Sequence, residues 1–184
     1  TKKILNLSEL KKKIGDRPRS EKVILCHGNF DMVHPGHVRH LTYAKSKAEI
    51  LVVSITADRF IKKGIYRPFV PENIRATNLA AFEMVDFVVI DHNKKPLKIL
   101  KSIKPDFFAK GFEYSSSGLP PATREELNLV SDYGGEMIFT PGDIVYSSTK
   151  ILNLAQPDIS NFKLLDIMKR NKITFDYLKK ILKN

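Results

Sequence analysis

The sequence predicts an α/β fold, a doubly wound, Rossmann-like parallel sheet of about five strands with short helices at the carboxyl end of the chain. Two observations predict it. Between residues 22 and 140, short apolar runs rich in β-branched and aromatic residues alternate with amphipathic segments of helical period. Strict alternation of this kind implies parallel strands joined by right-handed crossovers. The chain of 184 residues is also long enough to enclose one domain-sized core.

Each expected strand is a brief apolar run and is therefore expected to be buried. The runs lie at residues 22–26, 50–55, 85–90, 106–109 and 136–139. The helical patterns between them lie at residues 36–46, 71–82, 96–103 and 123–133. The first of these places Val38, Leu41 and Ala44 on one face. Gly134 is predicted to end the last one in a left-handed conformation.

The pattern changes after Thr140. A loop and a short helix lead to a break at Gln156-Pro157, and two small amphipathic helices follow. We therefore predict a main domain over residues 1–155 and a helical extension over residues 156–184, which packs on that domain or on a partner subunit. Because Thr1 stands where an initiator methionine is expected, we expect a processed or trimmed chain, and fusion to another domain in a longer polypeptide stays open.

The composition predicts a soluble protein of a reducing compartment. Hydrophobic residues make up 42% of the chain and charged residues 28%. No apolar stretch approaches the about 18 residues that a membrane span requires. Cys26 is the only cysteine, which excludes an internal disulfide, and no signal-peptide pattern is present. We expect a cytoplasmic location and no membrane partner.

The charge balance favours a polyanionic partner. The chain has 31 basic and 20 acidic side chains, for a formal net charge of +11. The basic residues are dispersed in pairs and triplets, and they do not alternate with aromatic residues as in a groove that binds single-stranded nucleic acid. A phosphorylated small ligand therefore fits better than nucleic acid, and simple solvation of the surface is the alternative.

One segment concentrates the side chains suited to phosphate chemistry. The sequence HGNFDMVHPGH, residues 27–37, joins the first predicted strand to the first predicted helix. Doubly wound sheets bind nucleotides at this edge, because backbone N–H groups and the positive end of the helix dipole meet the phosphates. His34 and His37 are three residues apart, so both imidazoles lie on one side of the helix start and can bind phosphate oxygens. Gly28 and Gly36 allow close approach of the backbone.

Other interpretations of these side chains stay open. His27 or His40, taken alone, is more often a satisfied core residue, and aspartate in the position of Asp31 commonly caps a turn. His34 and His37 are also candidate zinc ligands, but no third and fourth ligand occurs at the usual spacings. We therefore predict no metal site built from protein side chains alone.

The order Gly28-x-Phe30-Asp31-x-x-His34-x-Gly36-His37 resembles the G-x-F-D-x-x-H-x-G-H signature of a nucleotidyltransferase superfamily. This superfamily includes glycerol-3-phosphate and choline-phosphate cytidylyltransferases and the adenylyltransferase domain of ADP-heptose synthases. The full signature is specific, whereas HxGH alone is weak. The resemblance extends to the segments AKSKAEILVVSITADR, RPFVPENIR, FFAKGFEY and YSSTKI.

The resemblance implies a reaction and a set of site residues. Members of the superfamily catalyse attack of a substrate phosphate on the α-phosphorus of a nucleoside triphosphate, with Mg²⁺ bound and pyrophosphate released. His34, His37 and Lys45 are implied to be catalytic, and Arg67 and Arg75 to bind substrate phosphate. The implied nucleotide-binding residues are Gly28, Asn29, Phe30, Asp31, Gly36, Lys110, Gly111, Ser147, Ser148 and Thr149. Family members are often dimers, so a homodimer is a further expectation.

Each implied role has a plainer alternative. Asp31 is implied to orient a lysine or the metal. Hydroxyl groups at the predicted helix start near Ser147 form an anion site on physical grounds, but they also serve as ordinary helix caps. Any single one of the implied cations is also consistent with a solvated surface charge.

Departures from the family pattern leave the donor nucleotide open. Gly142 stands where glycerol-phosphate cytidylyltransferases usually have arginine, and Ala48-Glu49 replaces a usual Gly-Asp pair. The ending GGEMIFTPGDIVYSSTKI is closer in layout to heptose-phosphate adenylyltransferases, while the loop SSSGLPPATREE is peculiar to this chain and is a candidate for acceptor specificity. Both CTP and ATP therefore stay candidates.

The sequence thus predicts an enzyme that transfers CMP or AMP to a phosphorylated sugar, polyol or related phosphate or phosphonate. The alternative is a module of the same fold that binds nucleotide or nucleic acid without turnover. Pantetheine-phosphate and nicotinamide-mononucleotide adenylyltransferases fit the FDxxHxGH and YSSTKI segments less well. Class I aminoacyl-tRNA synthetases share an HxGH-like element but are far longer chains.

Overall fold

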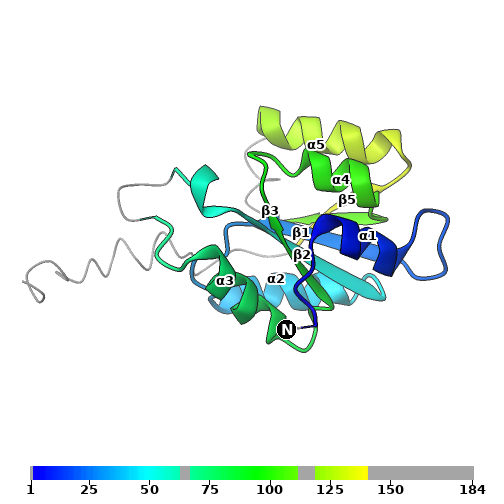
Figure 1. The fold of residues 1–184 in the computed structure, drawn as a ribbon. Helices are drawn as coiled ribbons and strands as arrows, with labels where there is room; N and C mark the ends of the chain where they lie inside the picture. The colour runs from blue at the N-terminus through cyan, green and yellow to red at the C-terminus, as the bar shows by residue number, and fades with distance from the viewer. Residues whose placement is uncertain (1, 63–66, 112–118, 141–184) are drawn as a thin grey trace, which may run out of the picture. The chain divides into compact units, whose positions relative to one another are not determined.

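The sheet is parallel throughout and has the strand order β3-β2-β1-β4-β5 (Figure 1). The computed structural model describes residues 2–62, 67–111 and 119–140, all of which belong to one unit, Thr1–Ser148. The strands are β1 (Val23–Gly28), β2 (Ile50–Thr56), β3 (Phe87–Asp91), β4 (Phe107–Lys110) and β5 (Glu136–Phe139). The predicted doubly wound fold is confirmed. The strand order reverses between β1 and β4, and ligands bind doubly wound sheets at such a switch point.

Helices cover both faces of the sheet (Figure 1). The helices α2 (Pro35–Lys45) and α3 (Glu72–Ala80) lie on one face. The helices α1 (Leu7–Ile14), α4 (Leu97–Ile103) and α5 (Pro121–Asp132) lie on the other, and a short 3₁₀ turn, η1 (Asp58–Phe60), follows β2. Gly134 has a φ of 75°, the left-handed conformation that we predicted after α5.

The sequence analysis did not predict α1. Its start has a capping box, in which the Asn6 side chain accepts a hydrogen bond from the Glu9 N–H and the Glu9 side chain accepts one from the Asn6 N–H. Leu10 and Ile14 are buried against the sheet. The signals were therefore present in the sequence, but the segment precedes the strand–helix alternation on which the fold prediction rests.

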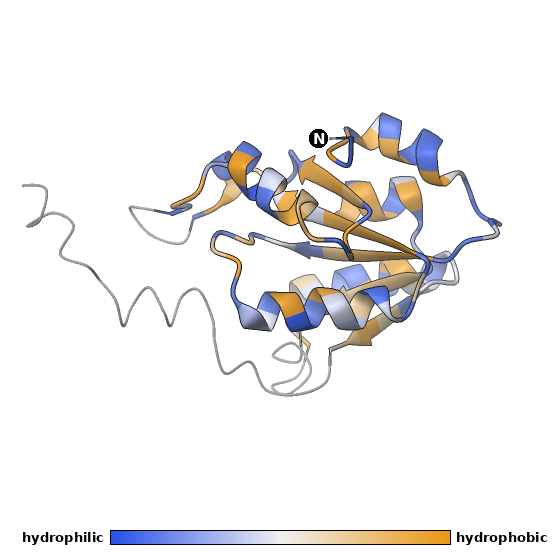
Figure 2. Ribbon diagram, turned by 90° about the horizontal axis from the view of Figure 1, so that it is seen from below, coloured by the Kyte–Doolittle hydropathy of each residue, from blue (hydrophilic) through white to orange (hydrophobic). Residues whose placement is uncertain are grey.

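Alternate side chains of each strand enter opposite apolar layers. In β1, Ile24 and Cys26 face α2 and α3, whereas Val23 and Leu25 face α1, α4 and α5. Figure 2 shows the strands as a hydrophobic layer between helices that contain both hydrophilic and hydrophobic residues. Because the strands are apolar along their length, the polar side chains at their carboxyl ends form a distinct edge.

None of the described helices is long and apolar enough to cross a membrane. The predicted C-terminal helices lie outside the described residues. The division at residue 155 therefore stays a prediction.

Candidate active site at the carboxyl edge of the sheet

His34 is the N-terminal capping residue of α2. Its backbone is extended, with φ −132° and ψ 169°, and its Nδ1 accepts a hydrogen bond from the Gly36 N–H at 3.1 Å. Pro35 occupies the first helical position, where its missing N–H costs nothing. Because Nδ1 acts as an acceptor, the imidazole is neutral and carries its proton on Nε2. Burial also lowers the pKa of His34, which favours the same neutral form.

His37 lies directly against His34. The two rings are stacked, with 3.9 Å between their centroids and 28° between their planes, and the Phe30 ring lies tilted against His37 at 4.9 Å. The structure therefore places both predicted imidazoles on one side of the helix start. Phe30 has a φ of 47°, and a Cβ at position 28 would lie 3.0 Å from its ring. Gly28 thus leaves room for the Phe30 ring, which would have to shift by a few tenths of an ångström to accept a Cβ there.

Asp31 joins the β1–α2 loop to the segment before α3. Its Oδ2 accepts a hydrogen bond from the Arg67 guanidinium at 2.7 Å, and its Oδ1 accepts from the N–H groups of Phe69 and Val70 at 2.8 and 3.0 Å. The carboxylate is only 6% exposed. The partner of Asp31 is therefore Arg67, where the resemblance implied a lysine or a metal.

Arg75 requires a correction, because it does not lie where it can bind substrate phosphate. Its side chain is 0% exposed. The guanidinium donates hydrogen bonds to the Val70, Asn29 and Thr56 carbonyls and to Asp58 Oδ1, the last at 2.6 Å. Arg75 therefore positions three loops of the carboxyl edge, and a single buried side chain holds the backbone around the site.

Two acidic residues that the sequence analysis missed support the same loops. Asp58 Oδ2 accepts a hydrogen bond from the Glu72 N–H at 3.1 Å, and Glu72 Oε2 accepts one from the Asp58 N–H at 2.6 Å. The two residues cap each other across the start of α3. They are fourteen positions apart in the chain, so no local pattern identifies the pair.

Lys45 also requires a correction. It is the last residue of α2, an eleven-residue helix whose first turn holds the histidines. Its Nζ donates to Asp86 Oδ2 and to the Glu49 carbonyl, each at 2.6 Å. Asp86 also accepts the Leu51 N–H at the start of β2. Lys45 therefore lies at the amino edge of the sheet, roughly 16 Å along the helix from His34, and fixes local structure there.

A second group of polar side chains lies at the carboxyl ends of β1, β2 and β4. His27 Nδ1 lies 2.7 Å from Ser54 Oγ, and His27 Nε2 lies 3.3 Å from Thr56 Oγ1. Lys110, at the end of β4 and next to Gly111, forms a 2.6 Å ion pair with Glu126 of α5. His27 thus has hydroxyl partners for both ring nitrogens, as expected for a satisfied core histidine.

His40 has a similar environment. Its Nδ1 lies 2.5 Å from Thr140 Oγ1. Burial lowers the pKa of His27 to about 3 and that of His40 to about 4, and the nearby Lys110 charge contributes a smaller part of each shift. Both rings are therefore neutral near pH 7, and the positive charge of this group of side chains is on Lys110.

The two depressed pKa values predict an acid-sensitive fold. A histidine in the unfolded chain titrates near pH 6.5, so below that pH the unfolded state binds protons that the folded state excludes. The free energy of unfolding is therefore expected to fall as the pH decreases from about 6.5 to about 4, by up to about 2 kcal/mol per histidine at about pH 5. Urea denaturation across this range tests the prediction. The double variant His27→Gln, His40→Gln should show a shallower pH dependence, and equal slopes in both proteins would contradict it.

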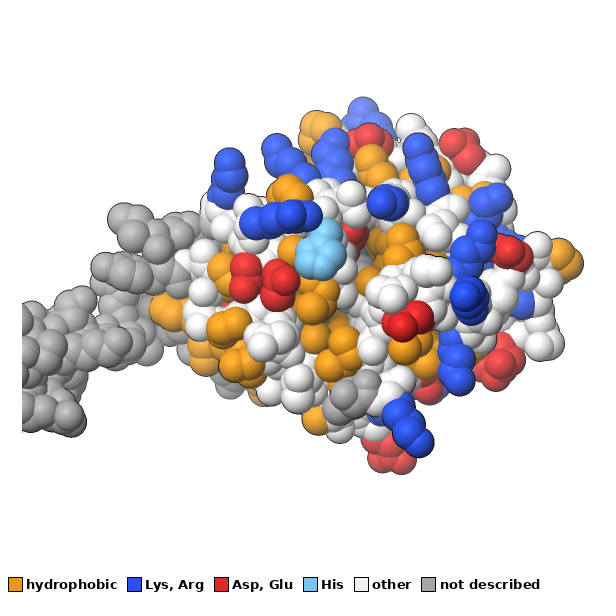
Figure 3. Space-filling model, viewed as in Figure 1, with side chains coloured by type: hydrophobic (Ala, Val, Ile, Leu, Met, Phe, Trp, Pro, Cys, Tyr) orange, Lys and Arg blue, Asp and Glu red, His pale blue; other side chains and the backbone are white. Residues whose placement is uncertain are grey.

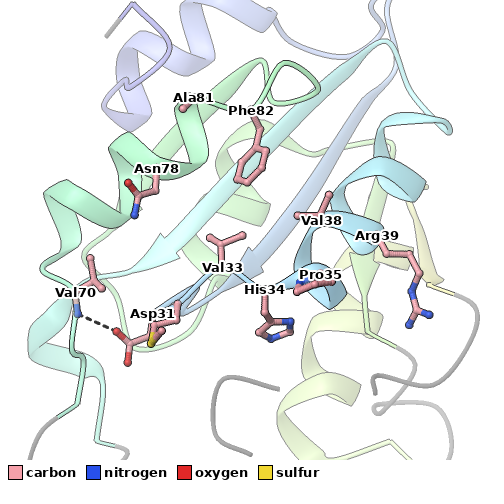
Figure 4. A pocket seen from close by; sticks show the side chains of 11 residues that line it. Asp31, Val33, His34, Pro35, Val38, Arg39, Val70, Asn78, Ala81 and Phe82 are labelled. Carbon is pink, nitrogen blue, oxygen red and sulfur yellow. Dashed lines mark hydrogen bonds between the residues drawn. The ribbon is translucent and has the colours of Figure 1, made fainter. Parts of the chain in front are cut away.

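A cavity of about 960 Å³ opens beside His34, between α2 and α3 (Figure 4). Val33, Val38 and Phe82 point into it, and Asp31 with its Val70 hydrogen bond lies at one end. The full lining is Asp31, Met32, Val33, His34, Pro35, Val38, Arg39, Val70, Asn78, Ala81 and Phe82. The sequence analysis did not predict this cavity, because its wall is shared by two helices that are distant in the chain.

The other predicted site residues divide into two groups. Asn29, Gly36 and Gly111 lie at the same carboxyl edge as the histidines. Ser147, Ser148 and Thr149 lie outside the described residues, so their predicted role stays a prediction. Among the described residues, no group of three or more His, Cys, Asp or Glu side chains is arranged to hold a metal ion.

Comparison with known proteins identifies the family. The cytidylyltransferase-like family model matches residues 25–154, well over half of the chain. The chain is 36% identical over 153 residues to the bifunctional protein HldE of Koribacter versatilis, which covers 82% of this chain and 30% of the relative. It is 40% identical over 116 residues to the bifunctional protein HldE of Campylobacter fetus, covering 62% of this chain and 25% of the relative. The chain thus spans less than a third of these relatives.

Solved structures support the fold. A lipopolysaccharide core biosynthesis protein from Thermoplasma volcanium superposes with a TM-score of 0.57 at 21% identity, covering 68% of this chain and all of that one. A pantoate-beta-alanine ligase from Francisella tularensis superposes with a TM-score of 0.59 at 16% identity, covering 96% of this chain and 85% of that one. With the HxGH signature at the start of α2, the family match shows that the chain belongs to the cytidylyltransferase-like family of nucleotidyltransferases.

Proposed function

We propose that the chain transfers CMP or AMP from CTP or ATP to the phosphate of a phosphorylated sugar, polyol or related phosphate or phosphonate. The observation that carries the proposal is the stacked pair of His34 and His37 at the start of α2, beside the switch point of the sheet. An oxygen of the acceptor phosphate attacks the α-phosphorus, the bond to the bridging oxygen of the β-phosphate breaks, and pyrophosphate leaves.

The protein side chains contribute alignment and charge stabilisation in this proposal, and none of them acts as a nucleophile. The Nε2–H of His34 donates to a phosphate oxygen, because its Nδ1 is already held by the Gly36 N–H. The N-terminus of α2 adds the positive end of the helix dipole. Arg67, fixed by Asp31, supplies a cation whose position is set before substrate arrives.

Mg²⁺ enters this proposal as part of the substrate, coordinated by the triphosphate oxygens. Both carboxylate oxygens of Asp31 already accept hydrogen bonds. Asp31, the acidic residue nearest the two histidines in the sequence, therefore already has protein donors on both oxygens. No step of the proposed reaction uses a protein-bound metal.

The acceptor is best assigned as a sugar phosphate. The layout of the GGEMIFTPGDIVYSSTKI segment resembles that of heptose-phosphate adenylyltransferases, which supports this class and an ATP donor. The matched relatives are bifunctional by name and much longer than this chain. This supports the further proposal that the domain works beside a second catalytic domain.

Pyrophosphate release tests the function directly. The 184-residue chain is incubated with Mg²⁺, one of several nucleoside triphosphates and a panel of sugar, polyol and phosphonate acceptors. Release that requires both a triphosphate and an acceptor phosphate supports the proposal. Salt-dependent binding of DNA or RNA without any release would support the non-catalytic alternative instead. On the face shown in Figure 3, Lys and Arg side chains gather along the upper edge, and Asp and Glu side chains lie among the Lys and Arg elsewhere.

The location of Lys45 predicts a small effect on turnover. Lys45→Met removes the ion pair with Asp86 at the amino edge of the sheet, so we expect a loss of about 1 kcal/mol in the free energy of unfolding. We expect kcat to stay within about threefold of the wild type, because the histidines are at the other end of α2. Steady-state kinetics and urea denaturation measure the two effects. A loss of about a hundredfold in kcat with unchanged stability would restore Lys45 to the catalytic site.

A further inference from the structure

We propose that Glu126 is a positioning residue for Lys110: its carboxylate holds the lysine ammonium at the carboxyl end of β4, where the ammonium binds the phosphates of the nucleoside triphosphate. This inference rests on the proposed function, since it concerns the same triphosphate. The sequence analysis did not single out Glu126, and it took Lys110 only as a nucleotide-binding residue.

The first observation is the burial of the pair. Lys110 Nζ and Glu126 Oε2 are 2.6 Å apart, and the two side chains are only 9% and 6% exposed. Removing two charges from water is costly, and a buried ion pair is often no more stabilising than apolar residues of similar size. An apolar pair between β4 and α5 would serve packing equally well. The retention of two charges here therefore points to a role besides packing.

The second observation is the place of Lys110 in the sheet. It is the last residue of β4, the strand that pairs with β1 at the switch point. The β1 strand leads into the loop that carries the HxGH histidines. Both strands therefore deliver their carboxyl ends to the edge where a nucleotide binds in this fold class. An ammonium has three N–H donors, so pairing with one carboxylate is compatible with contact to a phosphate.

The third observation is that the neighbouring imidazoles have hydroxyl partners. Both ring nitrogens of His27 lie within hydrogen-bond distance of hydroxyl groups of β2, and Nδ1 of His40 lies close to the Thr140 hydroxyl. These side chains therefore do not compete with Lys110 for the Glu126 carboxylate. Lys110 Nζ also lies 5.0 Å from the centre of the Phe108 ring, which adds a weaker second contact.

The ion pair with Glu126 determines the position of the Lys110 ammonium. A lysine has a flexible four-carbon stem, and without an anchor its charge moves toward water. Glu126 prevents this by fixing the ammonium before the triphosphate arrives. If only net charge mattered, removing the Glu126 carboxylate would make the site more positive and tighten the binding of an anion. If Glu126 positions the Lys110 ammonium, its removal should instead weaken triphosphate binding.

The test measures the dissociation constant of Mg²⁺-ATP and Mg²⁺-CTP by calorimetry on the 184-residue chain without acceptor. Glu126→Gln keeps the size of the side chain and removes its charge, and we expect it to weaken binding about tenfold. Glu126→Asp keeps the charge and should recover part of the affinity. Glu125→Gln is the matched control, because Glu125 is the preceding residue of α5 and pairs with Lys95 at the surface, where the two side chains are 48% and 46% exposed.

A double-mutant cycle separates positioning from simple stability. If Glu126 acts through Lys110, then Glu126→Gln should have no further effect on affinity in a Lys110→Met background. Binding by Glu126→Gln that is as tight as in the wild type, or an undiminished effect in the Lys110→Met background, would overturn the inference. A wild-type chain that binds triphosphate but releases no pyrophosphate with any acceptor contradicts the proposed function alone. A wild-type chain that binds no triphosphate contradicts both.

Discussion

Replacing either His34 or His37 by alanine is expected to lower kcat by about a hundredfold to a thousandfold. In the proposed reaction, both imidazoles face the phosphates as negative charge shifts from the attacking acceptor oxygen to the bridging oxygen of the leaving pyrophosphate. The stacked arrangement, with 3.9 Å between the ring centroids, means that each ring also holds the other in place. Loss of one ring should therefore disturb both donors, and the double variant should be little worse than the single ones.

The role of His34 as a helix cap must be distinguished from its proposed role in catalysis. His34→Ala removes the side chain that accepts the Gly36 N–H, so it also destabilises the start of α2 by about 1 kcal/mol. His34→Asn provides a good capping residue and should regain this stability while kcat stays low. His92→Ala, an exposed histidine after β3, is the control and should leave kcat unchanged. Full turnover in His34→Asn and His37→Ala would show that the imidazoles are not catalytic.

Arg75→Met is expected to have the largest effect on stability, a loss of about 3–5 kcal/mol in the free energy of unfolding. The guanidinium is 0% exposed and satisfies three backbone carbonyls as well as Asp58. A methionine fills much of the volume but removes the donors of the three carbonyls and the ion pair with Asp58. Urea denaturation measures the loss, and Arg59→Gln, an exposed arginine one turn after β2, should lose less than about 1 kcal/mol.

Arg75→Lys distinguishes positioning from phosphate contact. Lysine keeps the charge but cannot reach four acceptors, so it should also be clearly less stable than the wild type. A lysine variant of normal stability with a raised KM for the acceptor alone would instead support the original prediction of a phosphate contact.

The sequence alone predicted the fold because the relevant signals are local. Strand and helix periods, and the segment of residues 27–37 that joins the first strand to the first helix, all fall within windows of about ten residues. The two stacked histidines were predicted for the same reason, since three-residue spacing at a helix start determines their side.

The corrected residues depend on contacts that are remote in the chain. The acceptors of Arg75 are backbone carbonyls of residues 29, 56 and 70, and backbone atoms leave no residue-type signal. Lys45 was assigned from family resemblance, although the length of α2 already separates it from His34. Glu126 looks in sequence like an ordinary polar position of an amphipathic helix, and only the packing of α5 on β4 reveals its burial.

The central claim is that the imidazoles of His34 and His37 contact the nucleoside triphosphate. The most direct test is an NMR titration of the chain, with ¹⁵N-labelled histidine side chains, against Mg²⁺-ATP and Mg²⁺-CTP. The claim predicts saturable shifts of the His34 and His37 ring nitrogens, with His92 unchanged. Saturable nucleotide binding that leaves the His34 and His37 resonances in place would contradict it.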